Sequence, residues 1–206
     1  MSGYKPRRPA QLKPEQIELI QGDANITDNS ELAHASAQAV VPLSAIYTLE
    51  SEAIARVQEL IKTEGVDLLA ESWVNSPATS LPGILWRGYI LFEWIRRFGA
   101  EVNKRYRASC EYFSDTEPEK LDLVLSPDAL KNIWAEVFIG DYRGDFATVL
   151  RDSARFTDFL GMLVPEWIED ESHPLATAIT LRDTAMLRVS QEFREAGELL
   201  LAGKLS

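Results

Sequence analysis

Basic side chains are concentrated in one apolar stretch of an otherwise acidic chain. Between Trp86 and Arg107 there are six Lys or Arg residues and only two glutamates, whereas the 206-residue chain has a formal net charge of −11. At about 100° per residue along a helix, Arg97, Lys104 and Arg107 share one flank. Guanidinium and ammonium groups bind phosphates and carboxylates, and neighbouring aromatic rings offer stacking surfaces. The stretch therefore predicts a site for an anion.

Two interpretations of these basic residues stay open. In the first, they hold a small phosphate- or carboxylate-bearing ligand between the central and last helices. The candidate ligand-binding residues are Arg87, Arg97, Lys104, Trp86, Tyr89 and Arg182. In the second interpretation, the arginines pair with acidic side chains of neighbouring segments and the aromatic rings belong to the core. Acidic residues outnumber basic ones 32 to 21, and a charge run on a helix is usually salt-bridged or solvated.

Residues for metal or nucleophilic catalysis form no pattern in this sequence. His34 and His173 are the only histidines, and His173 does not lie three residues after a glutamate, so the two E-x-x-H pairs that metal-binding bundles use cannot both be formed. Cys110 is the single cysteine, and a lone cysteine without a base most often only fills space. No phosphate-cradling glycine motif is present either. We therefore expect no catalytic residue, no metal site and no cofactor, which favours a non-enzymatic role.

Composition places the chain among ordinary globular proteins. Hydrophobic residues make up 46% of it and charged residues 26%, and no apolar run approaches the roughly 20 residues of a membrane helix. The first residues lack the apolar core of a secretory signal, and one cysteine fits a reducing compartment. The expected protein is cytoplasmic and has no membrane partner. Its negative charge opposes nucleic-acid binding.

The first 29 residues differ from the rest. Residues 1–14 contain three prolines, Pro6, Pro9 and Pro14, and several basic side chains. They show no helical periodicity and have too few apolar residues to fold. A weak helix is expected over 15–21. The basic side chains are Lys5, Arg7, Arg8 and Lys13. We expect residues 1–29 to be a mobile basic tail with a weak helix, and nucleic acid to bind, if at all, only there. Residues 30–206 are expected to form a single domain.

A central helix over about 81–107 is expected to position the candidate site. Thr79 or Ser80 is its predicted N-cap, and Pro82 is tolerated in its first turn. Apolar residues form two stripes on it, which indicates neighbours on more than one side. Gly88 and Gly99 lie inside the pattern, and close helix crossings would explain both. The acidic residues 108–125 are predicted to be a loop.

The remaining pattern is helical throughout. One amphipathic helix is predicted to end at Gly65, another to start at Ser126-Pro127-Asp128, a third to be capped by Asp145, and a long C-terminal helix to run over about 174–201. No alternating strand pattern of useful length occurs. The sequence predicts an all-α, irregular bundle of roughly six to eight helices around the central one.

Binding to another protein, or self-association, is the function that this pattern favours. Trp167 lies in the Pro165-Glu166-Trp167-Ile168 turn, where a core role explains a tryptophan less readily than on a periodic helix face, so it is the candidate partner contact. The alternative function is a helical enzyme or sensor for a small anionic ligand, which requires the arginines of the central helix to converge on one pocket.

Overall fold

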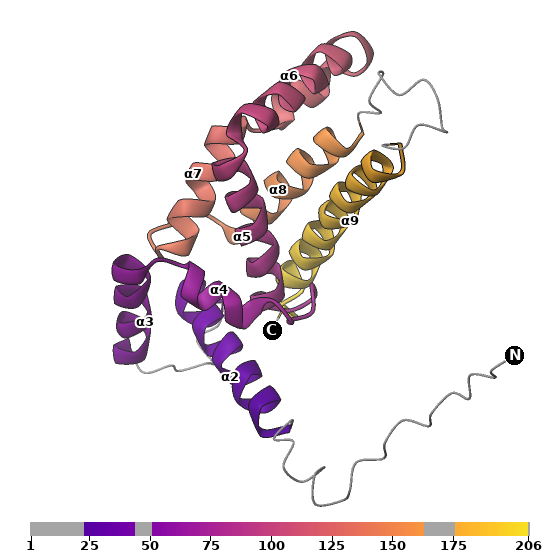
Figure 1. Cartoon of the computed structure of the whole chain (residues 1–206). Helices are drawn as coiled ribbons and strands as arrows, with labels where there is room; N and C mark the ends of the chain where they lie inside the picture. Colours follow the sequence, from indigo (N-terminus) through magenta and orange to yellow (C-terminus); the bar gives the residue numbers. More distant parts are fainter. Residues whose placement is uncertain (1–22, 44–50, 163–175, 206) are drawn as a thin grey trace, which may run out of the picture.

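The chain folds as an irregular bundle of helices (Figure 1). The computed structural model describes residues 23–43, 51–162 and 176–205, and these residues form eight α-helices and one short 3₁₀-helix, with no strand among them. The elements are α2 (Asp23–Val40), α3 (Ser51–Glu64), α4 (Asp67–Trp73), α5 (Leu81–Arg97), α6 (Gly99–Thr116), η1 (Pro118–Leu123), α7 (Pro127–Phe138), α8 (Phe146–Gly161) and α9 (Ala176–Leu201). The all-α prediction is confirmed.

Several helix ends follow from the capping residues that the sequence predicts. The Ser80 hydroxyl accepts a hydrogen bond from the Gly83 amide, Ser126 accepts one from Ala129, and the Asp145 carboxylate accepts one from Ala147. Each bond satisfies a first-turn N–H that has no partner inside its helix. Gly65, with a φ of 89°, ends α3 in the left-handed conformation that favours glycine. All four predicted boundaries are confirmed.

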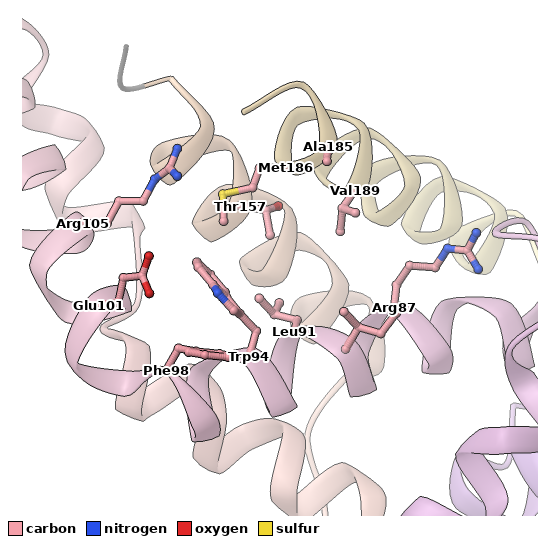
Figure 2. A pocket seen from close by; sticks show the side chains of 11 residues that line it. Arg87, Leu91, Trp94, Phe98, Glu101, Arg105, Thr157, Ala185, Met186 and Val189 are labelled. Atoms are coloured by element: carbon pink, nitrogen blue, oxygen red, sulfur yellow. The ribbon is translucent and has the colours of Figure 1, made fainter. Parts of the chain in front are cut away.

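The predicted single helix over about 81–107 is wrong. Phe98, with φ −117° and ψ 32°, ends α5, although its amide still bonds to the Trp94 carbonyl. Gly99 then begins a new helix, α6, which runs on to Thr116. The apolar periodicity hides this break because α5 and α6 both turn a face to the same core. The two helices instead meet at an angle that brings Glu101 and Arg105 beside α8 (Figure 2).

The predicted loop over 108–125 is also wrong. Residues 99–116 are α6, and η1 occupies 118–123. The buried face of α6 consists of Val102, Ser109 and Phe113, which recur at spacings of seven and four. Its acidic residues lie on the opposite, exposed face. Spacing, rather than the density of charge, therefore decides the conformation of this segment.

Helix α2 begins within the segment that the sequence analysis assigned to the mobile tail and weak helix. It starts at Asp23, before the predicted domain boundary at residue 30. The hydrophobic core extends from Ala33 in α2 to Leu205 after α9. The indole N–H of Trp73 in α4 donates to the Ser36 hydroxyl over 3.0 Å and ties α4 to α2.

The crossing of α5 and α7 depends on Gly88. A Cβ atom at this position would overlap the ring of Trp134, which is fully buried. The Trp134 indole donates to the Ser153 hydroxyl of α8 over 2.9 Å, so one side chain joins three helices. The close-crossing explanation is confirmed for Gly88. It is wrong for Gly99, because no atom of the described residues lies within 4 Å of where its Cβ would be.

Helices α8 and α9 pack side by side as an antiparallel pair (Figure 1). The Ser190 hydroxyl donates to the Ala154 carbonyl over 2.9 Å, and Arg194 pairs with Asp158 at 2.9 Å. Helix α5 lies across this pair. Of the helices described, none is both long and apolar enough to span a membrane.

Candidate ligand-binding cavity

A cavity of about 440 Å³ lies between α5, α6, α8 and α9 (Figure 2). This volume is within the usual range for small-molecule sites in proteins. The described residues that line it are Arg87, Ile90, Leu91, Trp94, Phe98, Glu101, Arg105, Thr157, Ala185, Met186 and Val189. Most of these side chains are apolar, and the charged ones are few.

The wall formed by α5 is a stripe of aromatic and aliphatic side chains. Ile90, Trp94 and Phe98 are four residues apart and therefore share one face of the helix. Trp94 is half-buried, whereas Ile90 and Phe98 keep 49% and 53% of their surface exposed. Met186 and Val189 of α9 line the cavity opposite them. The cavity is therefore a half-open apolar site.

The cavity exists because α9 packs closely on α8 but not on this part of α5. A Cβ atom at Gly161 of α8 would lie only 3.0 Å from Leu187 of α9. Farther along α9, Arg87 of α5 is joined to Glu192 by an ion pair of 3.0 Å. Between these two places, α5 and α9 leave the space that Trp94 and Met186 only partly fill.

The charge of Arg87 is neutralised at one end of the cavity. Its Nε donates to Glu192, and its Nη1 donates to the carbonyl oxygens of Ser76 (3.2 Å) and Gly83 (3.0 Å). Figure 2 shows its head group turned toward α9, away from Trp94. Its aliphatic stem is therefore the part that faces a ligand.

Arg105 and Glu101 of α6 lie at the other end. Arg105 donates from Nε and Nη2 to the Leu160 carbonyl at 3.0 and 2.7 Å, which satisfies a C-terminal carbonyl of α8 with a cation. Glu101 is exposed and has no ion-pair or hydrogen-bond partner within 23–43, 51–162 and 176–205. Thr157, between them, donates its hydroxyl proton to the Ser153 and Ala154 carbonyls.

No family model, no curated protein and no solved structure matches this chain. The function must therefore be argued from the residues alone.

Of the predicted arginines whose side chains the structure describes, Arg87 lines the cavity and Arg97 does not. Arg97 donates to the Glu93 carboxylate over 2.6 Å, Arg96 binds the same carboxylate through two hydrogen bonds, and neither arginine lines the cavity. The hydrogen bond from Arg96 lowers the pKa of the buried Glu93, although burial acts in the opposite direction. In the structure, Arg87 and Arg97 both pair with carboxylates, as in the second interpretation of the sequence.

Trp86 and Tyr89 also lie outside the cavity. Their rings stack on each other at 5.6 Å between centroids, and the Tyr89 hydroxyl donates to Asp67 of α4 over 2.7 Å. Burial, followed by the hydrogen bond to Asp67, raises the pKa of Tyr89 to about 12. Both residues pack against the core, and Tyr89 additionally meets Phe138 edge-on.

Lys104 lies on a separate surface. It shares an open depression with Asn103 and Arg107, as their spacing predicts, but Glu111 and Asp128 also line it. The mixture of signs makes this depression a weaker anion site than the sequence suggests. The structure therefore divides the predicted ligand-binding residues among three places.

Other sequence-based candidates lie outside the described residues. These are Trp167, the side chain of Arg182, and the basic residues Lys5, Arg7, Arg8 and Lys13. His173 lies there too. Over the described ranges, no group of three or more His, Cys, Asp or Glu side chains is placed to hold a metal ion.

Of the residues that line the cavity, the sequence analysis named only Arg87 and missed the others, among them Trp94, Phe98, Glu101 and Met186. The signal for two of them was the four-residue spacing of Ile90, Trp94 and Phe98 on a helix with two apolar stripes. That pattern predicts a second neighbour for α5, and the structure leaves part of this face without one. Met186 and Glu101 come from other helices, so no local pattern could include them.

Proposed function

We propose that the protein acts by binding a small, largely apolar ligand in the cavity between α5, α6, α8 and α9. The observation that carries this proposal is the half-open volume of about 440 Å³ walled by Trp94, Phe98, Met186 and Val189. An apolar surface of this kind releases water when a ligand covers it, which is the main driving force for binding in such pockets. Because the charge of Arg87 is already neutralised by Glu192, the shape of the ligand determines its orientation more than this arginine does.

A fluorescence titration tests this proposal. The neutral, apolar fluorophore N-phenylnaphthylamine brightens when it leaves water, and we expect saturable brightening with one molecule bound per chain. Ala185→Trp places an indole at the cavity wall on an exposed position, so it should abolish the signal without unfolding the protein. Arg188→Trp is the matched control, because Arg188 is a residue of the same helix that is 76% exposed and does not line the cavity.

The outcomes of this titration are distinct. Saturable binding that Ala185→Trp removes and Arg188→Trp retains supports the cavity as the site. Brightening that is not saturable, or that survives in the Ala185→Trp variant, contradicts it. Circular dichroism of both variants establishes that the helices are intact.

A second candidate function is binding to a protein partner or to a second copy of the chain. The observation that favours it is the exposure of Ile90 and Phe98 at the rim of the cavity, at 49% and 53% of their surface. Adjacent exposed apolar side chains mark interaction surfaces. Sedimentation velocity over a wide range of protein concentration tests self-association, which Phe98→Asp should abolish if this surface is the interface. If the protein is monomeric at every concentration, binding to a second copy of the chain is contradicted.

We also propose a reducing, cytoplasmic location for the protein. The support is the single cysteine, Cys110, which cannot form a disulfide within the chain and is half-buried beside the core. Fractionation of cells that express the natural protein tests this location. Recovery in an extracellular or envelope fraction would contradict it.

A further inference from the structure

The charged groups that line the cavity differ in what they leave for a ligand. Arg87 is neutralised by Glu192 and also donates to two backbone carbonyls. Arg105 turns its head group to the end of α8, where two of its N–H groups donate to Leu160. Glu101, by contrast, has no hydrogen-bond or ion-pair partner in the part of the chain that the structure describes. Its carboxylate is the charged lining group that is left to bind a ligand.

Aromatic rings lie at the same end of the cavity as this carboxylate. Figure 2 shows Trp94 and Phe98 on the side of Glu101, with Arg87 at the far end. The faces of aromatic rings attract cations, and tryptophan does so most strongly. A carboxylate next to two aromatic rings is a combination that favours an ammonium or guanidinium group and disfavours an anion.

We infer that the ligand is an amphipathic cation, with an apolar body between Trp94 and Met186 and a positively charged head at Glu101. This inference rests on the proposed function and adds the sign of the ligand's charge. It is opposite to the anionic ligand that the basic residues of the sequence suggest. The reason is that Glu192 neutralises Arg87, and that Arg97, which is paired with Glu93, does not line the cavity.

A displacement experiment with three matched probes tests this inference. Phenylbutylamine, phenylbutanol and phenylbutanoate share one apolar body and carry a positive, a neutral and a negative head at neutral pH. Each competes with N-phenylnaphthylamine for the wild-type protein, for Glu101→Gln, and for the control variant Glu111→Gln. Glu111 is also an exposed glutamate of α6, but it lines the other depression.

We expect the amine to displace the fluorophore at a concentration about fivefold lower than the alcohol, and the carboxylate to be the weakest, as an exposed ion pair with a cation–π contact allows. In Glu101→Gln, the amine and the alcohol should displace the fluorophore at about the same concentration. In Glu111→Gln, the amine should still displace it at a lower concentration than the alcohol. High salt should reduce the advantage of the amine, because the carboxylate is exposed.

Each other result overturns the inference. Equal displacement by amine and alcohol, a stronger carboxylate, or no displacement by any probe would show that the cavity does not select cations. An amine preference that persists in Glu101→Gln would show that Glu101 does not bind the positive head. The proposed function survives these results as long as the fluorophore itself binds saturably and Ala185→Trp removes it. Failure of the fluorophore to bind would instead contradict the proposed function.

Discussion

The Arg87 guanidinium of α5 donates from Nε to Oε2 of Glu192 in α9 over 3.0 Å, and this ion pair closes one end of the cavity. Both side chains are about four-fifths buried, with 21% and 19% of their surface exposed. The other described side chains of α5 and α9 that line the cavity are aromatic or aliphatic, or belong to Met186. The ion pair therefore helps to set the spacing of α5 and α9, and with it the width of the cavity.

Breaking this pair should destabilise the fold. Removing the carboxylate by Glu192→Leu leaves a largely buried guanidinium with two carbonyl partners only, so we expect the free energy of unfolding to fall by about 1 to 3 kcal/mol. Urea denaturation monitored by circular dichroism measures it. Arg188→Met is the control, because Arg188 is 76% exposed and lies 3.8 Å from the same carboxylate. If Arg188→Met lowers the free energy of unfolding as much as Glu192→Leu does, the Arg87–Glu192 pair is not the source of the stabilisation.

Two glycines of the central region should respond to alanine in opposite directions. A methyl group at Gly88 would overlap the Trp134 ring, so Gly88→Ala is expected to cost about 1 to 3 kcal/mol by overpacking. Gly99→Ala has open space and should stabilise α6 by up to about 1 kcal/mol through helix propensity. Thermal unfolding of both variants checks the contrast. A stabilised Gly88→Ala protein would show that α5 and α7 do not cross closely.

Two fully buried serines offer a similar contrast. Ser153 accepts the hydrogen bond of the Trp134 indole, whereas the Ser109 hydroxyl has no hydrogen-bond partner among the described residues. Ser153→Ala leaves a buried N–H unsatisfied and should cost about 1 to 3 kcal/mol. Ser109→Ala removes an unsatisfied hydroxyl and should be neutral or stabilising. Equal losses of stability in chemical denaturation would refute the difference in bonding.

Glu93 should make stability depend on pH in the acidic range. Its pKa in the folded protein is lowered below the usual 4.5 by the hydrogen bond from Arg96. A depressed pKa means that the carboxylate stabilises the fold above the pKa of the unfolded chain, and that this contribution is lost as the pH falls through the folded-state pKa. Glu93→Gln should therefore be less stable than wild type by about 1 to 2 kcal/mol at neutral pH.

The difference between wild type and Glu93→Gln should shrink when denaturation curves are recorded at progressively lower pH below 4.5. Glu136→Gln, an exposed glutamate for which no ion pair is found among the described residues, is the control. A difference that stays constant from neutral to acidic pH would mean that ionised Glu93 does not stabilise the fold.

Much of the fold could be predicted from local sequence because local chemistry determines it. Ser80, Ser126 and Asp145 cap their helices through their own side chains, and Gly65 ends α3 because its φ suits glycine. The break at Phe98 could not be predicted in this way. Gly99, a poor helix former, follows it directly, but the apolar spacing continues across both residues. Tertiary packing therefore decides between one continuous helix and two.

The candidate site was predicted less well, for a physical reason. A run of arginines shows the charge that a helix carries, but not the charge that remains after folding. Glu192 lies far from Arg87 in sequence, and Glu93 lies one turn from Arg97 on the same helix. Both remove a positive charge that the sequence appeared to offer a ligand. The cavity itself arises from the spacing of α5 and α9, which no single segment encodes.

Fluorine NMR of protein labelled with fluorotryptophan tests the central claim most directly. The five tryptophans give separate signals that single Trp→Phe variants assign. On titration with N-phenylnaphthylamine, we predict that the Trp94 resonance moves saturably, because its ring lines the cavity, while the resonances of the buried Trp73 and Trp134 stay in place. A Trp94 signal that does not move while the fluorophore binds would contradict the account, since the ligand would then occupy another site.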